Sequence, residues 1–111
     1  MRRVATVSQM TDTYDVVWPR SRQVVDLQDL ADRPATLDGR TVGFLWDYLF
    51  RGDEIFPVIA EELRARYPTV EIVDFEEFGS THGDGEAELV AALPDILRAR
   101  GVDVVVSGMA C

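Results

Sequence analysis

The fold is decided by the stretch TVGFLW, residues 41–46, which is a nearly continuous apolar run. Such a run is typical of a strand that is buried on both faces of a sheet, as strands of parallel sheets are. Two further strands are predicted downstream, at residues 70–75 (VEIVDF) and 102–106 (VDVVV). Helical patterns separate the three strands, so the predicted order is strand, helix, strand, helix, strand.

The first helix is predicted to begin with Asp53 as its N-cap and to end at Pro68, with Pro57 tolerated in the first turn. Its helical spacing predicts one buried face, formed by Phe56, Ile59, Ala60, Leu63 and Tyr67.

The second helix is predicted from about Glu86 to Arg100, and Pro94 should kink or split it because proline removes a backbone donor. Its predicted buried stripe consists of Leu89, Val90, Leu93, Ile96 and Leu97.

Right-handed crossovers would make all three strands parallel. We therefore expect an α/β fold: a three-layer βαβαβ half of a doubly wound (flavodoxin- or Rossmann-like) parallel sheet, with strand order 2-1-3 and one helix on each face. Residues 1–38 show no clear period and are expected to form an irregular N-terminal arm, with weak strand candidates at 16–18 and 24–27. Residues 39–111 are expected to form the domain.

Composition restricts the class of protein. The chain of 111 residues suits one domain, and its net charge of -9 argues against nucleic acid and anionic membranes as partners. A single cysteine fits a reducing compartment, and no signal peptide or membrane-spanning apolar run is present, so a cytoplasmic protein is predicted. Lys and Asn are absent, which a GC-rich bacterial genome would explain.

Ligands of such sheets bind outside the carboxyl ends of the strands, where the order of connections reverses. That crevice would lie between the first and third strands. The residues predicted to contact a substrate there are Trp46, Asp47, Tyr48, Ser107 and Gly108.

Two residues are candidates for catalysis. Cys111 follows the third strand in a glycine-containing loop, where a thiol can be exposed and activated; the alternative is a small buried apolar residue. His82 could act as a base, although such a histidine often caps a helix or lies in solvent. One histidine and one cysteine are too few for a metal site, so neither a metal nor another cofactor is predicted.

The loop GSTHGDG, residues 79–85, precedes the second helix and is rich in glycine. Its amide groups could bind an anion, but Asp84 and Glu86 place negative charge there. The alternative is a flexible connector with Asp84 as the N-cap.

Residues 37–45 (LDGRTVGFL) and 104–111 (VVVSGMAC) resemble the UGSC family, and residues 79–83 (GSTHG) resemble a subgroup pattern within it. The family is named for a motif of selenocysteine or cysteine followed by Gly-Ser-Cys, placed shortly after the third core strand. The resemblance covers roughly residues 37–111. It implies a thiol- or selenol-dependent redox domain, with distant kinship to the selenoprotein subunits of glycine-, betaine-, sarcosine- and D-proline-type reductases.

In the family pattern the motif would come directly after Cys111, where this sequence stops. The codon UGA encodes selenocysteine in selenoproteins and is otherwise a stop codon. One hypothesis is therefore that a UGA codon was read as a stop and that the chain is the N-terminal portion of a longer selenoprotein, inactive without the motif. The resemblance then implies that Cys111 is a resolving or nucleophilic thiol, with His82, Asp47 and Tyr48 in supporting roles.

Two other functions stay open: a small non-catalytic subunit of an α/β heteromer or homo-oligomer, and a small-molecule-binding domain. The apolar residues 104–106 would leave a bare strand edge, which predicts self-association or pairing with a second chain.

Overall fold

The computed structural model describes residues 15, 17, 19 and 25–109. The chain divides into two compact units, Met1–Ala31 and Asp32–Cys111. The described residues of the first unit are exposed and belong to no helix or strand. The predicted strand at 24–27 is therefore absent over residues 25–27, and most of the candidate at 16–18 lies outside the described residues.

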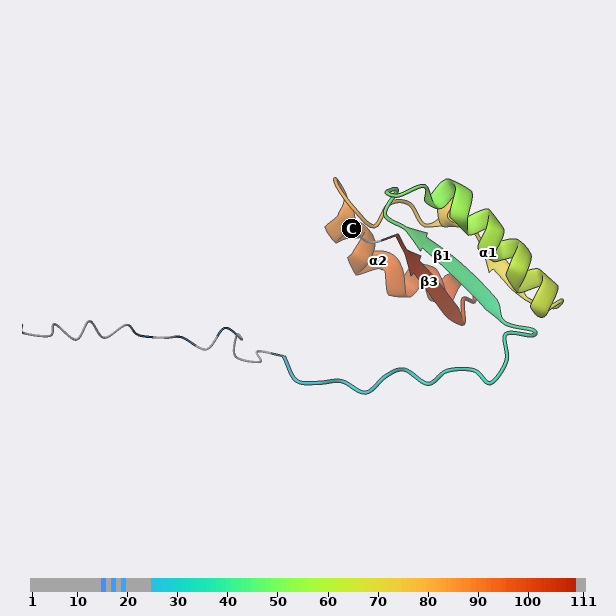
Figure 1. Ribbon diagram of the computed structural model, residues 1–111, viewed down its shortest axis with the longest axis horizontal. Helices are drawn as coiled ribbons and strands as arrows, with labels where there is room; N and C mark the ends of the chain where they lie inside the picture. The colour runs from blue at the N-terminus through green and yellow to red at the C-terminus, as the bar shows by residue number, and fades with distance from the viewer. Residues whose placement is uncertain (1–14, 16, 18, 20–24, 110–111) are drawn as a thin grey trace, which may run out of the picture. The chain divides into compact units, whose positions relative to one another are not determined.

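The second unit contains a parallel three-stranded sheet, formed by β1 (Thr41–Trp46), β2 (Glu71–Val73) and β3 (Val104–Gly108) (Figure 1). The strand order is β2-β1-β3, which confirms the predicted topology. Val42 lies opposite Ile72 of β2 and Val104 of β3. The central strand is buried from Val42 through Trp46, as its apolar run predicts.

The helices α1 (Gly52–Arg66) and α2 (Glu86–Ala99) follow β1 and β2, and the short 3-10 helix η1 (Phe75–Glu77) follows β2. The crossover from β1 to β2 and the crossover from β2 past β1 to β3 run in opposite directions, so right-handed connections place the two helices on opposite faces of the sheet (Figure 1).

The main core lies between the sheet and α1. The rings of Phe44 from β1 and Phe56 from α1 are stacked with centroids 4.8 Å apart, and both side chains are fully buried. The face predicted for α1 is confirmed: Phe56 and Ala60 are buried, and Ile59, Leu63 and Tyr67 pack against the same cluster.

The face that carries α2 is less well covered. A Cβ atom at Gly43 would lie 3.1 Å from Val102 and 3.3 Å from Phe78, so this part of β1 is closely packed. However, α2 has no buried residue, and Val90 of the predicted stripe is 52% exposed. The other four residues of the predicted stripe are half-buried, so the stripe is only partly covered, because helical spacing sets which side chains share a face and not what covers that face.

The N-caps of both helices differ from the predicted residues, although α2 begins at Glu86 as predicted. The N-cap of α1 is Arg51 and that of α2 is Gly85, in place of Asp53 and Asp84, and neither helix has a side-chain cap. Left-handed turns at these two residues start the helices instead.

Each helix also contains a proline. Pro57 lies in the second turn of α1, and α2 continues unbroken past Pro94, so the expected split does not occur. Each proline removes one backbone donor, and the remaining helical hydrogen bonds hold both helices together. Within the described residues, neither helix is long and apolar enough to cross a bilayer.

Strand ends also differ from the prediction. The second strand ends at Val73, because the Asp74 carboxylate accepts a hydrogen bond from the N–H of Phe75 at 2.7 Å and caps η1. The third strand lies two residues further along than predicted, so Ser107 and Gly108 belong to β3 and not to the loop after it.

Candidate functional site at the carboxyl edge of the sheet

Asp47 joins the carboxyl ends of β1 and β3. Its backbone N–H donates to the carbonyl of Gly108 at 3.2 Å. Its Oδ1 accepts two further hydrogen bonds, from the N–H of Leu49 and from the N–H of Met109, each at 3.1 Å. One carboxylate oxygen therefore binds the backbone that follows both strands, so Asp47 has a structural role in the predicted crevice.

The turn after β1 has an unusual backbone. Tyr48, Phe50 and Arg51 have φ angles of 63°, 56° and 57°, in the left-handed region that non-glycine residues rarely adopt. The Nε1 of Trp46 donates a hydrogen bond to the carbonyl of Leu49 at 2.8 Å, and this bond stabilises the turn. Left-handed non-glycine residues cost energy and are often found at functional sites.

Gly52 allows the turn to close on the core. A Cβ atom at this position would lie 2.7 Å from Cδ1 of Trp46, which is closer than real Cβ contacts. The first residue of α1 must therefore be glycine for the helix to start against the Trp46 ring.

The aromatic residues of this edge fall into a buried and an exposed group. Trp46 is buried, stacks on Tyr48 with centroids 4.4 Å apart and meets Phe75 edge-on at 4.8 Å. Tyr48 is 46% exposed and Phe50 is 60% exposed. Of the predicted aromatic contacts, Tyr48 can meet a ligand, whereas Trp46 forms the support beneath it.

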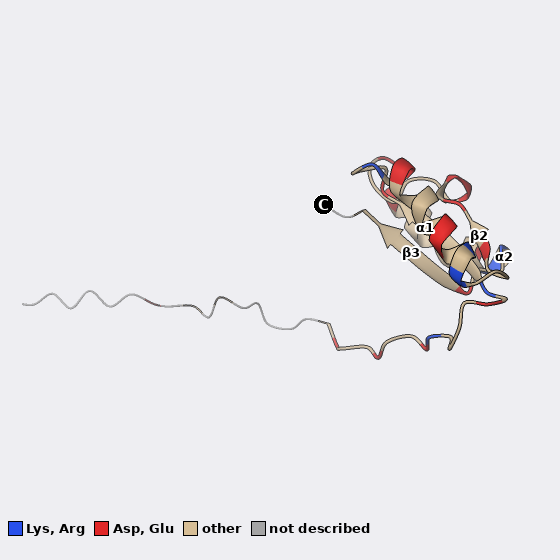
Figure 2. Cartoon of the chain, turned by 45° about the vertical axis from the view of Figure 1, so that its right-hand side comes forward, with Lys and Arg blue, Asp and Glu red and all other residues tan. Residues whose placement is uncertain are grey.

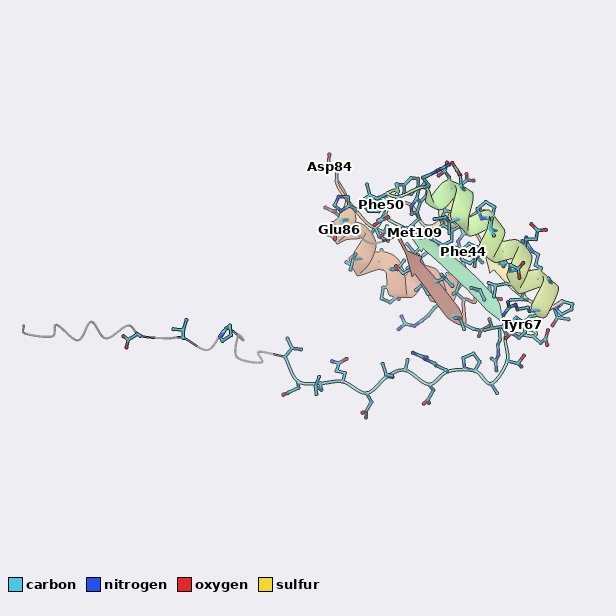
Figure 3. The ribbon with its side chains drawn as sticks, in the orientation of Figure 1. Phe44, Phe50, Tyr67, Asp84, Glu86 and Met109 are labelled. Carbon is cyan, nitrogen blue, oxygen red and sulfur yellow. The ribbon has the colours of Figure 1, made fainter. Side chains whose placement is uncertain are left out.

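Phe50 was missed by sequence reasoning. Figure 3 shows it at the same end of the sheet as Met109, Asp84 and Glu86. An aromatic residue four positions after a buried strand carries no functional signal by itself. Its exposure results from the left-handed turn, and the left-handed positions of that turn contain no glycine from which the turn could be predicted.

The loop of residues 79–85 reaches the same edge from the side of β2. Ser80 forms a bridge with Trp46, and the N–H of Thr81 donates to the Trp46 carbonyl at 3.2 Å. His82 follows and is exposed, with its N–H bonded to Ser80 Oγ at 3.2 Å. Among the described residues, no hydrogen bond or ion pair joins the His82 imidazole to another group.

The third strand brings Ser107 and Gly108 to this edge. Ser107 is exposed, and Gly108 has open space where a Cβ atom would lie. Met109 is half-buried and packs against the core. Cys111 lies outside the described residues, so its proximity to His82 stays a prediction.

The electrostatics of the edge are acidic. Asp84 and Glu86 are exposed there (Figure 3), and the Arg51 guanidinium pairs with Glu54, with Nε 3.0 Å from Oε1. No group of three metal-binding side chains occurs in the part of the chain that the structure describes. The site therefore favours a neutral or cationic ligand over an anion.

The parallel β2-β1-β3 sheet, with crossovers on both faces and its loops gathered at one edge, defines an α/β domain of the doubly wound type. The UGSC family model matches residues 15–111, so the chain belongs to the UGSC family. The match begins 22 residues before Leu37 and includes part of the N-terminal arm. No curated protein and no solved structure matches the chain.

Proposed function

We propose that this chain takes part in thiol- or selenol-dependent redox chemistry, with the reactive group on the segment that leaves β3. One observation carries the proposal: Asp47 fixes Gly108 and Met109 to the exit of β1, at 3.2 Å and 3.1 Å. The segment leading to Cys111 therefore starts from a rigid point in the crevice where ligands of such sheets bind. Membership of the UGSC family supports the same chemistry.

The chemistry of the chain alone is limited to one thiol. The motif that names the family does not occur in residues 1–111, which contain a single cysteine. The Cys111 thiolate can attack a disulfide: its sulfur forms a mixed disulfide, and the other half of that disulfide leaves as a thiolate. Turnover then needs a second thiol or selenol from outside these residues, so the chain alone should be catalytically weak. An unpaired thiol persists most readily in a reducing compartment, so the proposal includes a cytoplasmic location.

The remaining roles are positioning of the segment, proton transfer and substrate contact, and each is proposed for a different residue. Asp47 positions the segment, because its Oδ1 is occupied by two backbone N–H groups. The exposed imidazole of His82 is available to take or give a proton, and the exposed ring of Tyr48 is available to contact the substrate. Asp84 and Glu86 should disfavour anionic disulfides, so a neutral disulfide is the better substrate.

The test is the reaction of the full chain with a neutral disulfide, bis(2-hydroxyethyl) disulfide, followed by mass spectrometry. The matched controls are the pentapeptide Ser-Gly-Met-Ala-Cys, which has the same local sequence without the fold, and Cys111→Ser. We expect the folded chain to react severalfold faster than the peptide, with one adduct at Cys111. A rate equal to or below that of the peptide would refute an activated thiol.

A second function is favoured by one observation, the exposure of Tyr48 and Phe50 on the strained turn. Two aromatic rings beside the crevice could bind the apolar part of a small molecule without any chemistry at Cys111. Addition of benzyl alcohol, a neutral aromatic probe, should change the NMR chemical shifts of Tyr48 and Phe50. In Phe50→Ala the probe should leave the chemical shift of Tyr48 unchanged. Shifts spread evenly over the surface would argue against this site.

A further inference from the structure

The outer edge of β3 has no partner strand among the described residues, since β3 is the last strand in the order β2-β1-β3. The carbonyl of Gly108 accepts a hydrogen bond from Asp47, so the backbone of Gly108 faces β1. Backbone groups alternate in direction along a strand, so Val106 also faces β1. The N–H and C=O groups of Val105 and Ser107 therefore point to the open edge.

This edge has none of the usual protection against pairing. Edge strands of natural proteins commonly carry charges or proline. Residues 104–109 contain neither, although 28% of the chain is charged, and β3 is uncharged along its whole length in Figure 2. An uncharged, valine-rich edge in so acidic a chain indicates a surface that is paired in use.

The helix beside this edge is also incompletely covered. None of its residues is buried, and Val90 is 52% exposed. On the sheet, Val105 is 38% exposed, and it shares the α2 face with Gly43 because it lies opposite Gly43 in register. The edge of β3 is thus unpaired among the described residues, and exposed apolar side chains remain on both elements, Val105 on β3 and Val90 on α2.

We propose that a second copy of this chain covers this edge, by antiparallel pairing of β3 with the partner's β3 about a two-fold axis at Val106. In that register Val105 lies opposite Ser107 of the partner subunit. Each outward N–H and C=O of these residues then has a partner. The two three-stranded sheets become one continuous mixed sheet, with the two sites at opposite edges of that sheet.

Charge complementarity favours a second copy over an unrelated partner. A two-fold axis perpendicular to the sheet places both α2 helices on the same face and antiparallel. The first turn of α2 carries Glu86 and Glu88, and its last turn carries Arg98, followed by Arg100. Within the chain Arg98 pairs with Asp95 and Arg100 with Glu77, in exposed ion pairs that contribute little stability and can exchange partners. Antiparallel helices bring the acidic end of each toward the basic end of the other, so one surface complements itself.

The first test is sedimentation of the full chain over a broad range of concentrations, with a reductant present to exclude a Cys111 disulfide. Val105→Lys introduces the charge that natural edges use, and Val58→Lys is the matched control, because Val58 is 59% exposed on α1. We expect wild type and Val58→Lys to dimerise, with a dissociation constant raised at least about tenfold in Val105→Lys. The proposal would be overturned if the wild-type chain stayed monomeric at every concentration. It would also be overturned if the chain formed a complex only with a different polypeptide. Equal weakening in both variants would also overturn it.

The second test reads strand pairing at single amides and does not depend on a variant folding. Hydrogen exchange followed by NMR should show a protected Val106 amide at every concentration, because it faces β1. The Val105 and Ser107 amides should gain protection as concentration rises. Rapid exchange of these two amides in a sample that sediments as a dimer would place the interface elsewhere. Neither test involves the thiol, so they stand or fall separately from the redox proposal.

Discussion

The carboxylate of Asp47 accepts a hydrogen bond from the backbone N–H of Met109, 62 residues further along the chain, at 3.1 Å. The same oxygen accepts from the N–H of Leu49, also at 3.1 Å. The contact joins the first strand of the sheet to the last, at the edge where ligands of this fold bind. Its consequence is that the geometry of the candidate site depends on one side chain.

Replacement of Asp47 tests that dependence through stability. Asp47→Ala leaves two backbone N–H groups without their acceptor and should lower the free energy of unfolding by about 1–3 kcal/mol. Asp47→Asn keeps an oxygen in the same place and should cost clearly less. Urea unfolding followed by circular dichroism measures both. Equal losses for the two variants would show that charge, and not the acceptor, is what matters at this position.

Gly52 should be intolerant of a side chain. Alanine normally stabilises a helix relative to glycine by about 1 kcal/mol. Here its Cβ atom would overlap the Trp46 ring, so Gly52→Ala should be destabilising by about 1–3 kcal/mol. The control is Gly108→Ala, where no atom lies within 4 Å of the added Cβ. A gain in stability for Gly52→Ala would contradict the observed contact.

Phe56 should carry much of the stability of the α1 face. Its ring is fully buried against Phe44, and Phe56→Ala should cost about 3–5 kcal/mol, enough to unfold a marginal domain. Val58→Ala, on the exposed side of the same helix, should change stability by less than about 0.5 kcal/mol. Thermal unfolding of the two variants side by side gives the comparison, and similar melting temperatures would rule out this core.

The sequence predicts the sheet well, because its signal is local and strong. Residues 41–46 form β1 as predicted, since a strand buried on both faces must be apolar throughout. The third strand is displaced because Ser107 and Gly108 have no apolar signal, yet the backbone bond from Asp47 to Gly108 keeps them in the sheet. Where a strand ends thus depends on its neighbour.

The candidate site is only partly predictable. The fold rule places Asp47, Tyr48 and Gly108 at one edge, and the structure brings them there. The left-handed turn at Tyr48, Phe50 and Arg51 has no glycine to announce it, so the exposure of Phe50 and the N-cap at Arg51 could not be read from the residues. One of the two hydrogen bonds to Asp47 Oδ1 comes from Met109, a tertiary contact that the sequence does not encode locally.

The most direct measurement is the rate at which Cys111 exchanges with bis(2-hydroxyethyl) disulfide in wild type, Asp47→Asn and Asp47→Ala, under conditions where circular dichroism shows each variant folded. If the sheet edge holds the reactive segment through Asp47, wild type should react fastest. Asp47→Asn should stay close to wild type, and Asp47→Ala should fall toward the rate of the free pentapeptide. Identical rates for all three proteins and the peptide would show that the fold does nothing for this thiol, and would contradict the proposed function.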